Sequence, residues 1–332
     1  MKLLNVERLP AETNECHAST IVYHEGHRII AWFGGYQEGM ACDIWARVDE
    51  GKAVPVVFST HRYMHPSSMW NPILFTVDGH LLMFYKEGKF CDSWQTFLAE
   101  CYIKDGELKV QKPAVIPAGF NGPVKTKPFQ EGTMLICGSS VETRDDWSSY
   151  VEVYNYSKEG LGIAGRSNPI KNKPNKAKIK GIIQPAIWKE DDIYHMLIRS
   201  SSESSFIYHS KSLPNNPLYW EQATPTNINN PNSSIDVLQY SNGKLYIAYN
   251  PGSTERTPLV IAEFELSYKY KLPFLNIKKS VEIDLEEGWA DLHDNRPRTK
   301  ELSYPYMLEN AGTIEVSYTF CRKEIRLAVI EV

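Results

Sequence analysis

One stretch of this sequence, Trp70–Gly88, has the pattern of a β-hairpin. It reads WNPILFTV, then Asp78-Gly79, then HLLMFYKEG, so that two apolar runs flank a two-residue turn. Apolar runs on both sides of an Asp-Gly pair are the strongest short-range hairpin signal that a sequence offers. The same pattern recurs along the chain, and its second strands are predicted to begin near residues 27, 80, 132, 193, 244 and 313.

These six hairpins are spread over the whole chain of 332 residues, 51–69 residues apart. A single hairpin cannot bury its apolar face, so copies at this period predict repeat units that pack against one another. Sheets repeated around an axis form a propeller. We therefore expect an all-β chain folded as a six-bladed β-propeller of four-stranded antiparallel blades, with residues 1–332 in a single domain. Residues 1–15 should close the ring by pairing with the last blade.

Composition limits the partners and the location of the chain. The formal net charge of −4 gives no reason to expect binding to nucleic acid or to an anionic membrane surface. No apolar run approaches the ~20 residues that cross a bilayer, and the first residues lack the apolar segment of a secretory signal. Six cysteines without a CxxC pair are typical of reduced thiols in an intracellular protein. We expect a cytoplasmic protein.

Polar residues stand just before the predicted first strand of every blade, and first strands line the channel of a propeller. They are His17, Asn71, Lys125, Lys127, Gln184, Asp236, Glu301 and Tyr304. Four of them directly precede a proline, which lacks a ladder donor and is expected at the first residue of a strand. Arg199 and Arg256 are predicted to join them from the far ends of hairpins. Such groups are costly to bury unpaired, so we expect either a ligand site or a plug of ion pairs and waters that fills the channel.

Several segments, in order along the chain, carry a family resemblance. ECHASTIV, WNPILF, GPVKTKP, IIQPAIW, NPNSSID, RTPLVIA and ELSYPYML together resemble the BNR-repeat-like branch of the sialidase (neuraminidase) superfamily, over residues 15–332. The resemblance implies a six-bladed propeller and the ancestry of an exo-acting glycoside hydrolase. In sialidases of this superfamily three arginines bind the substrate carboxylate. A tyrosine activated by a glutamate attacks the anomeric carbon, and an aspartate serves as acid and base.

Four residues of this chain match positions of that site. Tyr304, in SYPYML, falls where the nucleophilic tyrosine would stand. Arg199 and Arg256 fall where two of the three arginines would stand. Asp43, just before IWAR, is the nearest match to the acid/base aspartate, and its alternative role is to cap a turn at the end of a strand.

Two positions depart from the family pattern, and intact Asp-box turns (SxDxGxTW) are absent. His17 replaces the first arginine, where it would contact substrate, act as acid or base, or be a buried histidine bonded to backbone. Gln184 replaces the activating glutamate, and an amide cannot accept the proton of a phenol. Glu301 or Asp236 would have to accept it instead, although Glu301 is as readily explained by a salt bridge to a channel arginine.

The remaining residues predict how a ligand would be held. Arg199 and Arg256, with Lys125 and Lys127, would form a cationic floor for a carboxylated sugar, because guanidinium groups pair with carboxylates in a fixed, bidentate geometry. Cations near the nucleophilic tyrosine would also favour its ionised form. The side-chain amides predicted to bind sugar hydroxyls are Asn71, Gln184 and Asn250.

Other candidate constellations carry fewer of the required groups. His61 and His65 have helical i, i+4 spacing, but no third ligand accompanies them, so we expect no metal site. No motif for a phosphate-bearing cofactor is present, and we expect none to be needed. Asp291, His293 and Asp294 lie in a long insertion before the last blade, where they could close over a substrate as a lid.

Three functions remain open from the sequence. The first is an exo-glycosidase that releases an acidic sugar from an oligosaccharide, with Tyr304 or a carboxylate pair in the chemistry. The second is a β-eliminating lyase on a uronic-acid glycoside, in which Tyr304 or His17 removes the C5 proton. The third is a carbohydrate-binding propeller without catalysis. The absorbance of an unsaturated product separates the lyase from the hydrolase, and an intact ligand after long incubation indicates binding alone.

Overall fold

The computed structural model describes residues 1–60, 67–111, 113–172, 179–283 and 301–332. The candidate residues His61, His65, Asp291, His293 and Asp294 lie outside the described residues. The regular structure described is β-strand throughout, apart from one 3-10 turn at Cys91–Ser93. Among the described residues, no helix has the length and apolar character needed to cross a bilayer.

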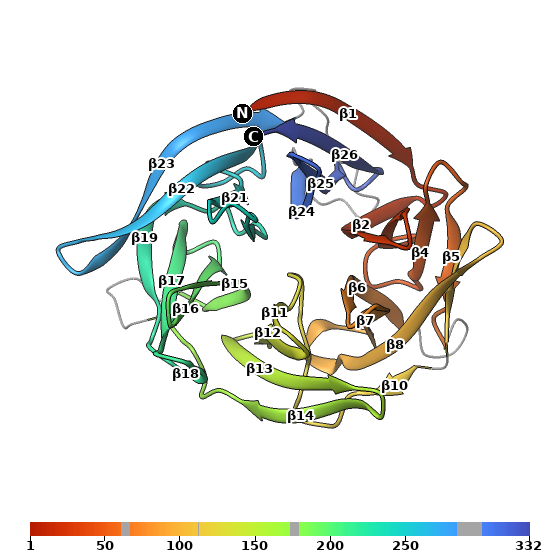
Figure 1. Cartoon of the computed structure of the whole chain (residues 1–332), viewed down its shortest axis with the longest axis horizontal. Helices are drawn as coiled ribbons and strands as arrows, with labels where there is room; N and C mark the ends of the chain where they lie inside the picture. Colours follow the sequence, from red (N-terminus) through yellow and green to blue (C-terminus); the bar gives the residue numbers. More distant parts are fainter. Residues whose placement is uncertain (61–66, 112, 173–178, 284–300) are drawn as a thin grey trace.

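Six antiparallel sheets surround a common axis, and Figure 1 looks down that axis. From the axis outward, blades one to six are β2 (Glu15–His24), β3 (His27–Gly35), β4 (Asp43–Val48) and β5 (Val54–Val57); β6 (Ser68–Val77), β7 (His80–Gly88), β8 (Gln95–Lys104), β9 (Glu107–Val110) and β10 (Ala114–Val115); β11 (Phe129–Glu131), β12 (Met134–Glu142), β13 (Trp147–Ser157) and β14 (Gly160–Arg166); β15 (Ile182–Glu190), β16 (Ile193–Ser200), β17 (Phe206–Leu213), β18 (Asn216–Trp220) and β19 (Thr224–Asn229); β20 (Asp236–Gln239), β21 (Leu245–Tyr249), β22 (Leu259–Lys269) and β23 (Leu272–Ile283); and β24 (Leu302–Asn310), β25 (Thr313–Phe320), β26 (Glu324–Glu331) and β1 (Lys2–Pro10). The predicted six-bladed propeller of four-stranded blades is confirmed, with one added short strand in blades two and four.

The ring is closed by the two ends of the chain. β1 pairs antiparallel with β26, from Lys2 opposite Glu331 to Pro10 opposite Glu324. The N- and C-termini accordingly lie side by side in Figure 1. The N-terminal strand is therefore the outer strand of blade six, as predicted, and it covers an edge that would otherwise be open to pairing.

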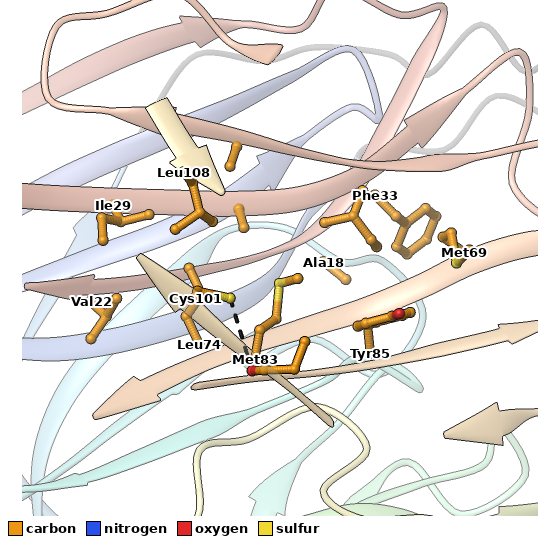
Figure 2. Close-up of a cluster of buried hydrophobic side chains, with 14 of the residues drawn as sticks. Ala18, Val22, Ile29, Phe33, Met69, Leu74, Met83, Tyr85, Cys101 and Leu108 are labelled. Carbon is orange, nitrogen blue, oxygen red and sulfur yellow. Dashed lines mark hydrogen bonds between the residues drawn. The ribbon is translucent and has the colours of Figure 1, made fainter. Parts of the chain in front are cut away.

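Apolar side chains fill the spaces between neighbouring blades. Figure 2 shows one such cluster, in which Val22 and Phe33 of blade one lie with Leu74 and Met83 of blade two. The inner strands are buried along most of their length because both faces of each sheet meet another sheet. This explains why they read as near-continuous apolar runs rather than as an alternating pattern. Each fully buried large aliphatic or aromatic side chain contributes roughly 1.5–3 kcal/mol to the stability of the fold.

Four inner strands carry a β-bulge near their first residues. The pairing shifts register at His17/Thr20 in β2, at Trp70/Ile73 in β6, at Ile183/Ala186 in β15 and at Ser303/Tyr306 in β24. At these bulges Asn71, Gln184 and Tyr304 have φ angles of 38°, 58° and 55°. A left-handed backbone costs a non-glycine residue of order 1–3 kcal/mol and is retained where the surrounding structure enforces it. The bulges re-aim these three side chains.

The positions of the prolines correct one expectation. Pro72, Pro185 and Pro305 were expected to be the first residues of their strands, but each lies two or more residues inside β6, β15 or β24. At a bulge the ladder is interrupted, so a residue without an N–H donor loses no hydrogen bond there. The Asn-Pro, Gln-Pro and Tyr-Pro pairs therefore mark bulges, not strand starts.

Candidate active site

Tyr304, at the bulge of β24, is the centre of a polar cluster at one mouth of the channel. Its hydroxyl oxygen accepts a hydrogen bond from Arg199 Nη1 (2.9 Å) and one from Gln184 Nε2 (3.3 Å). Arg199 Nη1 also donates to Gln184 Oε1 (3.0 Å). The guanidinium group thus fixes the orientation of the Gln184 amide, with its NH₂ toward the phenol. An oxygen that accepts two hydrogen bonds, one of them from a cation, is an oxygen on which negative charge is stabilised.

Arg199, the next-to-last residue of β16, is held rigidly from behind. Its Nε and Nη2 both donate to Asn232 Oδ1, at 3.0 and 2.8 Å. Its guanidinium carbon lies 5.7 Å from the ring centroid of Trp147 and 5.7 Å from that of Tyr304. A side chain with four such contacts keeps its position without a ligand, which is the preorganisation that a binding or catalytic site requires.

His17, in β2, packs against the other side of the phenol. The two ring centroids are 4.1 Å apart. Nδ1 lies 3.0 Å from Thr319 Oγ1, whereas Nε2 is buried and has no hydrogen-bond partner among the described residues. Burial, together with the charge of Arg322, holds the pKa of His17 well below its ordinary value. The imidazole is therefore neutral near pH 7, with one ring nitrogen uncommitted.

A second polar cluster surrounds the carboxylate of Glu301, just before β24. The carboxylate accepts hydrogen bonds from Arg256 Nη1 (2.8 Å), Arg322 Nε (2.9 Å) and Ser303 Oγ (2.6 Å). Arg256 also donates to the Asn232 carbonyl (2.9 Å). Burial alone would raise the pKa of Glu301, but the charges of Arg322 and Arg256 outweigh it and hold the pKa well below its ordinary value. The salt bridge to a channel arginine, one of the two readings from the sequence, is present.

The two lysines do not form the expected cationic floor. Lys125 Nζ donates to the Pro305 carbonyl (3.0 Å) and lies 5.8 Å from the Tyr304 ring centroid, and burial lowers the pKa of Lys125 to about 8. Lys127 Nζ instead forms a salt bridge with Asp236 (2.7 Å), which also accepts the Met307 N–H, three residues along β24 from Tyr304. Because this pair neutralises itself further along the channel, neither member is available to the phenol.

Three other predicted site residues are engaged elsewhere. Asp43, at the start of β4, accepts the N–H of Ser59 through Oδ1 (2.9 Å) on the rim of blade one. Asn71 donates to the Val124 carbonyl (2.9 Å), which links blades two and three. Asn250 is fully buried, and its amide donates to the carbonyls of Pro258 (2.8 Å) and Leu302 (3.0 Å). Its expected role as a hydroxyl binder is therefore wrong, because no ligand can reach it.

The geometry agrees with what the chain is similar to. A family model described as the BNR repeat-like domain matches residues 26–316. The chain belongs to the BNR repeat-like domain family. No curated protein sequence matches it.

Solved structures share the fold of this BNR repeat-like protein. A Trypanosoma rangeli sialidase in complex with 2,3-difluorosialic acid (covalent intermediate) matches with a TM-score of 0.65 and 10% identity, over 99% of this chain and 60% of that one. A leech intramolecular trans-sialidase matches with a TM-score of 0.57 and 10% identity, over 99% and 69% of the two chains. A Penicillium chrysogenum α-L-arabinanase complexed with arabinobiose matches with a TM-score of 0.60 and 11% identity, over 100% and 99%. At these identities the matches show the fold, a glycosidase-like propeller.

Sequence reasoning missed several residues of this BNR repeat-like protein's channel mouth. They are Glu38, Glu142, Asn232 and Arg322. Arg322 contacts both Glu38 and Glu301. A signal for it existed, since it follows the second strand of blade six much as Arg199 ends the second strand of blade four. Comparing equivalent positions between blades would have found it.

Metal ligation has no support in the part of the chain that the structure describes. Within those ranges, no three His, Cys, Asp or Glu side chains are grouped so that they could hold a metal ion.

Proposed function

We propose that this propeller is an exo-acting glycoside hydrolase that releases a terminal sugar carrying a carboxylate, with Tyr304 as its nucleophile. The observation that carries the proposal is the Tyr304 hydroxyl, which accepts hydrogen bonds from Arg199 and Gln184 at the mouth of the channel. A tyrosine needed only for packing would not require a cation fixed on its oxygen. The glycosidase-like fold supports the same reading, and sialidases are among the structures that share it.

The charges at the mouth support an anionic substrate. The guanidinium groups of Arg199, Arg256 and Arg322 face two carboxylates, those of Glu301 and Glu38, so one positive charge is left over. Arg256 is 21% exposed. It is therefore accessible to a ligand. A sugar carboxylate bound there would gain charge-assisted hydrogen bonds in a fixed orientation.

The proposed chemistry is a double displacement. Tyr304, deprotonated and stabilised by Arg199, attacks the anomeric carbon as the glycosidic bond breaks, which gives a glycosyl–tyrosine intermediate. Water then releases the sugar with net retention of configuration. Glu301 holds its arginines in place and is not the base, since its low pKa and its hydrogen bonds leave it a weak proton acceptor. His17 is the group beside Tyr304 that can exchange a proton through its uncommitted Nε2. Asp43 is the acid/base candidate suggested by the family resemblance.

The test compares Tyr304→Phe with Tyr306→Phe. Tyr306 is the matched control because it is a buried tyrosine two residues along β24 whose hydroxyl donates to the Leu74 carbonyl. Aryl glycosides of sialic and uronic acids are the substrates. We expect Tyr304→Phe to lower kcat by more than about 10³-fold, and Tyr306→Phe to stay within about threefold of wild type. A 2,3-difluorinated acidic sugar should label Tyr304, as peptide mass spectrometry would show. Full activity of Tyr304→Phe would refute the proposal.

One observation favours a second candidate, a β-eliminating lyase on uronic-acid glycosides. The neutral His17 imidazole with its buried, unpartnered Nε2 has the form of a base that could remove a C5 proton. A lyase product carries a double bond that absorbs in the ultraviolet, and a hydrolase product does not. A product that absorbs, with loss of activity in His17→Ala, would replace the hydrolase with the lyase. Tight binding of an intact sugar would indicate a carbohydrate-binding propeller instead.

We also propose that residues 1–332 act as one domain in the cytoplasm. Ring closure by β1 and β26 supports a single folding unit. All six cysteines are free thiols, and five of them are buried. Free thiols at this number are typical of proteins in a reducing compartment.

A further inference from the structure

A second hollow adjoins the Tyr304 site on the same side of the propeller. It is a cavity of about 300 Å³ between blades two, three and four, and its walls include Phe90, Asp92, Glu142, Arg144, Trp147 and Lys180. Two aromatic side chains among several hydrogen-bonding groups are the composition of a pocket for a polar organic ligand such as a sugar. The cavity has no part in holding the terminal sugar as proposed above.

The cavity and the Tyr304 site have a wall in common. The Trp147 ring, which lines the cavity, lies 5.7 Å from the guanidinium carbon of Arg199, and that guanidinium group donates to Tyr304. Glu142 is the cross-strand partner of Trp147 in the pairing of β12 with β13. A glycoside whose terminal ring lay over Tyr304 would therefore extend its next unit toward Glu142.

Glu142 differs from the other carboxylates at the mouth. Glu301 and Glu38 are each paired with arginine, whereas Glu142 forms no salt bridge within the described ranges and accepts one hydrogen bond from Ser140 Oγ (3.2 Å). Burial raises the pKa of Glu142, although the charge of Arg199 opposes the rise. A carboxyl group in such surroundings keeps its proton to higher pH, which is the property required of a general acid.

We propose that the cavity binds the leaving sugar unit and that Glu142 is the acid that protonates the glycosidic oxygen. This inference rests on the proposed hydrolase function. The Glu142 proton goes to the glycosidic oxygen as its bond to the anomeric carbon breaks and the bond to Tyr304 Oη forms. In the second step the Glu142 carboxylate takes a proton from the attacking water, the tyrosine leaves as phenolate, and both groups return to their starting states.

The experiment compares two substrates that share one acidic sugar. In the first the sugar is linked to a second sugar, and in the second it is a glycosyl fluoride, whose leaving group is small and needs little protonation. Glu142→Gln should lower kcat/KM for the sugar-linked substrate by about 10²–10⁴-fold, and for the fluoride by less than about tenfold. Asp78→Asn, the same chemical change in the turn at the opposite end of β6, should alter neither.

A further variant tests the pocket without touching the carboxyl group. Phe90 is 60% exposed, so Phe90→Ala should fold normally. It should raise KM for the sugar-linked substrate about threefold to tenfold and leave kcat/KM for the fluoride unchanged. This variant keeps the inference testable should Glu142→Gln prove unstable.

The outcomes separate the two proposals. Wild-type turnover of the fluoride supports the hydrolase function by itself, and its absence would overturn that function and this inference together. With the fluoride turned over, an equal loss on both substrates in Glu142→Gln would overturn the inference alone. It would also be overturned by finding the leaving-group dependence in Asp43→Asn and not in Glu142→Gln.

Discussion

Glu301→Gln removes one negative charge from the point where two arginines meet. The wild-type carboxylate is 3% exposed and accepts hydrogen bonds from Arg256, Arg322 and Ser303. The glutamine side chain has the same size but only one acceptor oxygen, and its NH₂ group would face a guanidinium group. The variant therefore leaves buried positive charge without compensation while it changes the packing very little.

The expected loss of stability is large for a single substitution. Removing one partner of a buried ion pair costs about 3–5 kcal/mol, because the remaining charge stays desolvated. The chain provides a matched control in Glu50, which also contacts two arginines, Arg28 at 3.2 Å and Arg47 at 3.0 Å, but is 79% exposed. Solvent-exposed pairs contribute about 0–1 kcal/mol. Glu50→Gln should therefore be almost neutral, although the number of its arginine contacts is the same.

Urea unfolding of the three proteins measures the difference, provided that the slope m is unchanged. The pH dependence gives a second check on the same reasoning. Since the folded-state pKa of Glu301 is depressed, its contribution is complete above the unfolded-state pKa of about 4.3. It is lost as the pH falls through the folded-state pKa. The gap between wild type and Glu301→Gln should narrow only in that acidic range. A loss no larger than that of Glu50→Gln at pH 7 would refute this account of the charge cluster.

Two further predictions concern groups that contact Tyr304 or His17. Lys125→Met removes a lysine whose burial lowers its pKa to about 8, so between pH 8 and 10 the unfolded wild type binds more protons than the folded form and gains stability with rising pH. Relative to Lys125→Met, wild type should gain on the order of 1–3 kcal/mol over that range in urea titrations, and parallel curves would contradict the prediction. Thr319→Val leaves His17 Nδ1 and the Ala18 N–H without their shared partner and should cost about 1–3 kcal/mol in the same assay; unchanged stability would show that the contact is not a stabilising one.

Local pattern was enough to find most of the blades and many of the site residues. The second strands expected at His27, His80, Ile193 and Thr313 begin at those residues. A tight turn fixes where the strand after it begins, so an Asp-Gly or similar turn locates the strand with little ambiguity. The same reading placed Gln184, Arg199 and Tyr304 together at the channel mouth, because equivalent positions in successive blades lie at the same height along the axis.

The sequence could not show which polar groups pair with one another. Gln184 and Tyr304 are separated by 120 residues, Lys127 and Asp236 by 109, and Arg322 reaches Glu38 across 284. No local pattern encodes such contacts, since they depend on which blades face each other across the closed ring. For this reason Lys127 appeared to be a free cation, although Asp236 neutralises it.

What the sequence determined by itself is therefore the repeat: a hairpin period, a continuous apolar run on each inner strand and a polar residue at the head of that strand. Each of these follows from interactions between residues that are close along the chain. The tertiary structure alone decided the charge state and the direction of those polar residues. A bulge turned Tyr304 toward Arg199, and ring closure brought Glu301 between Arg256 and Arg322. Burial then set the pKa of His17, Lys125 and Glu142. Electrostatic energy depends on distance and solvent exposure in the folded molecule, and neither is written in the order of the residues.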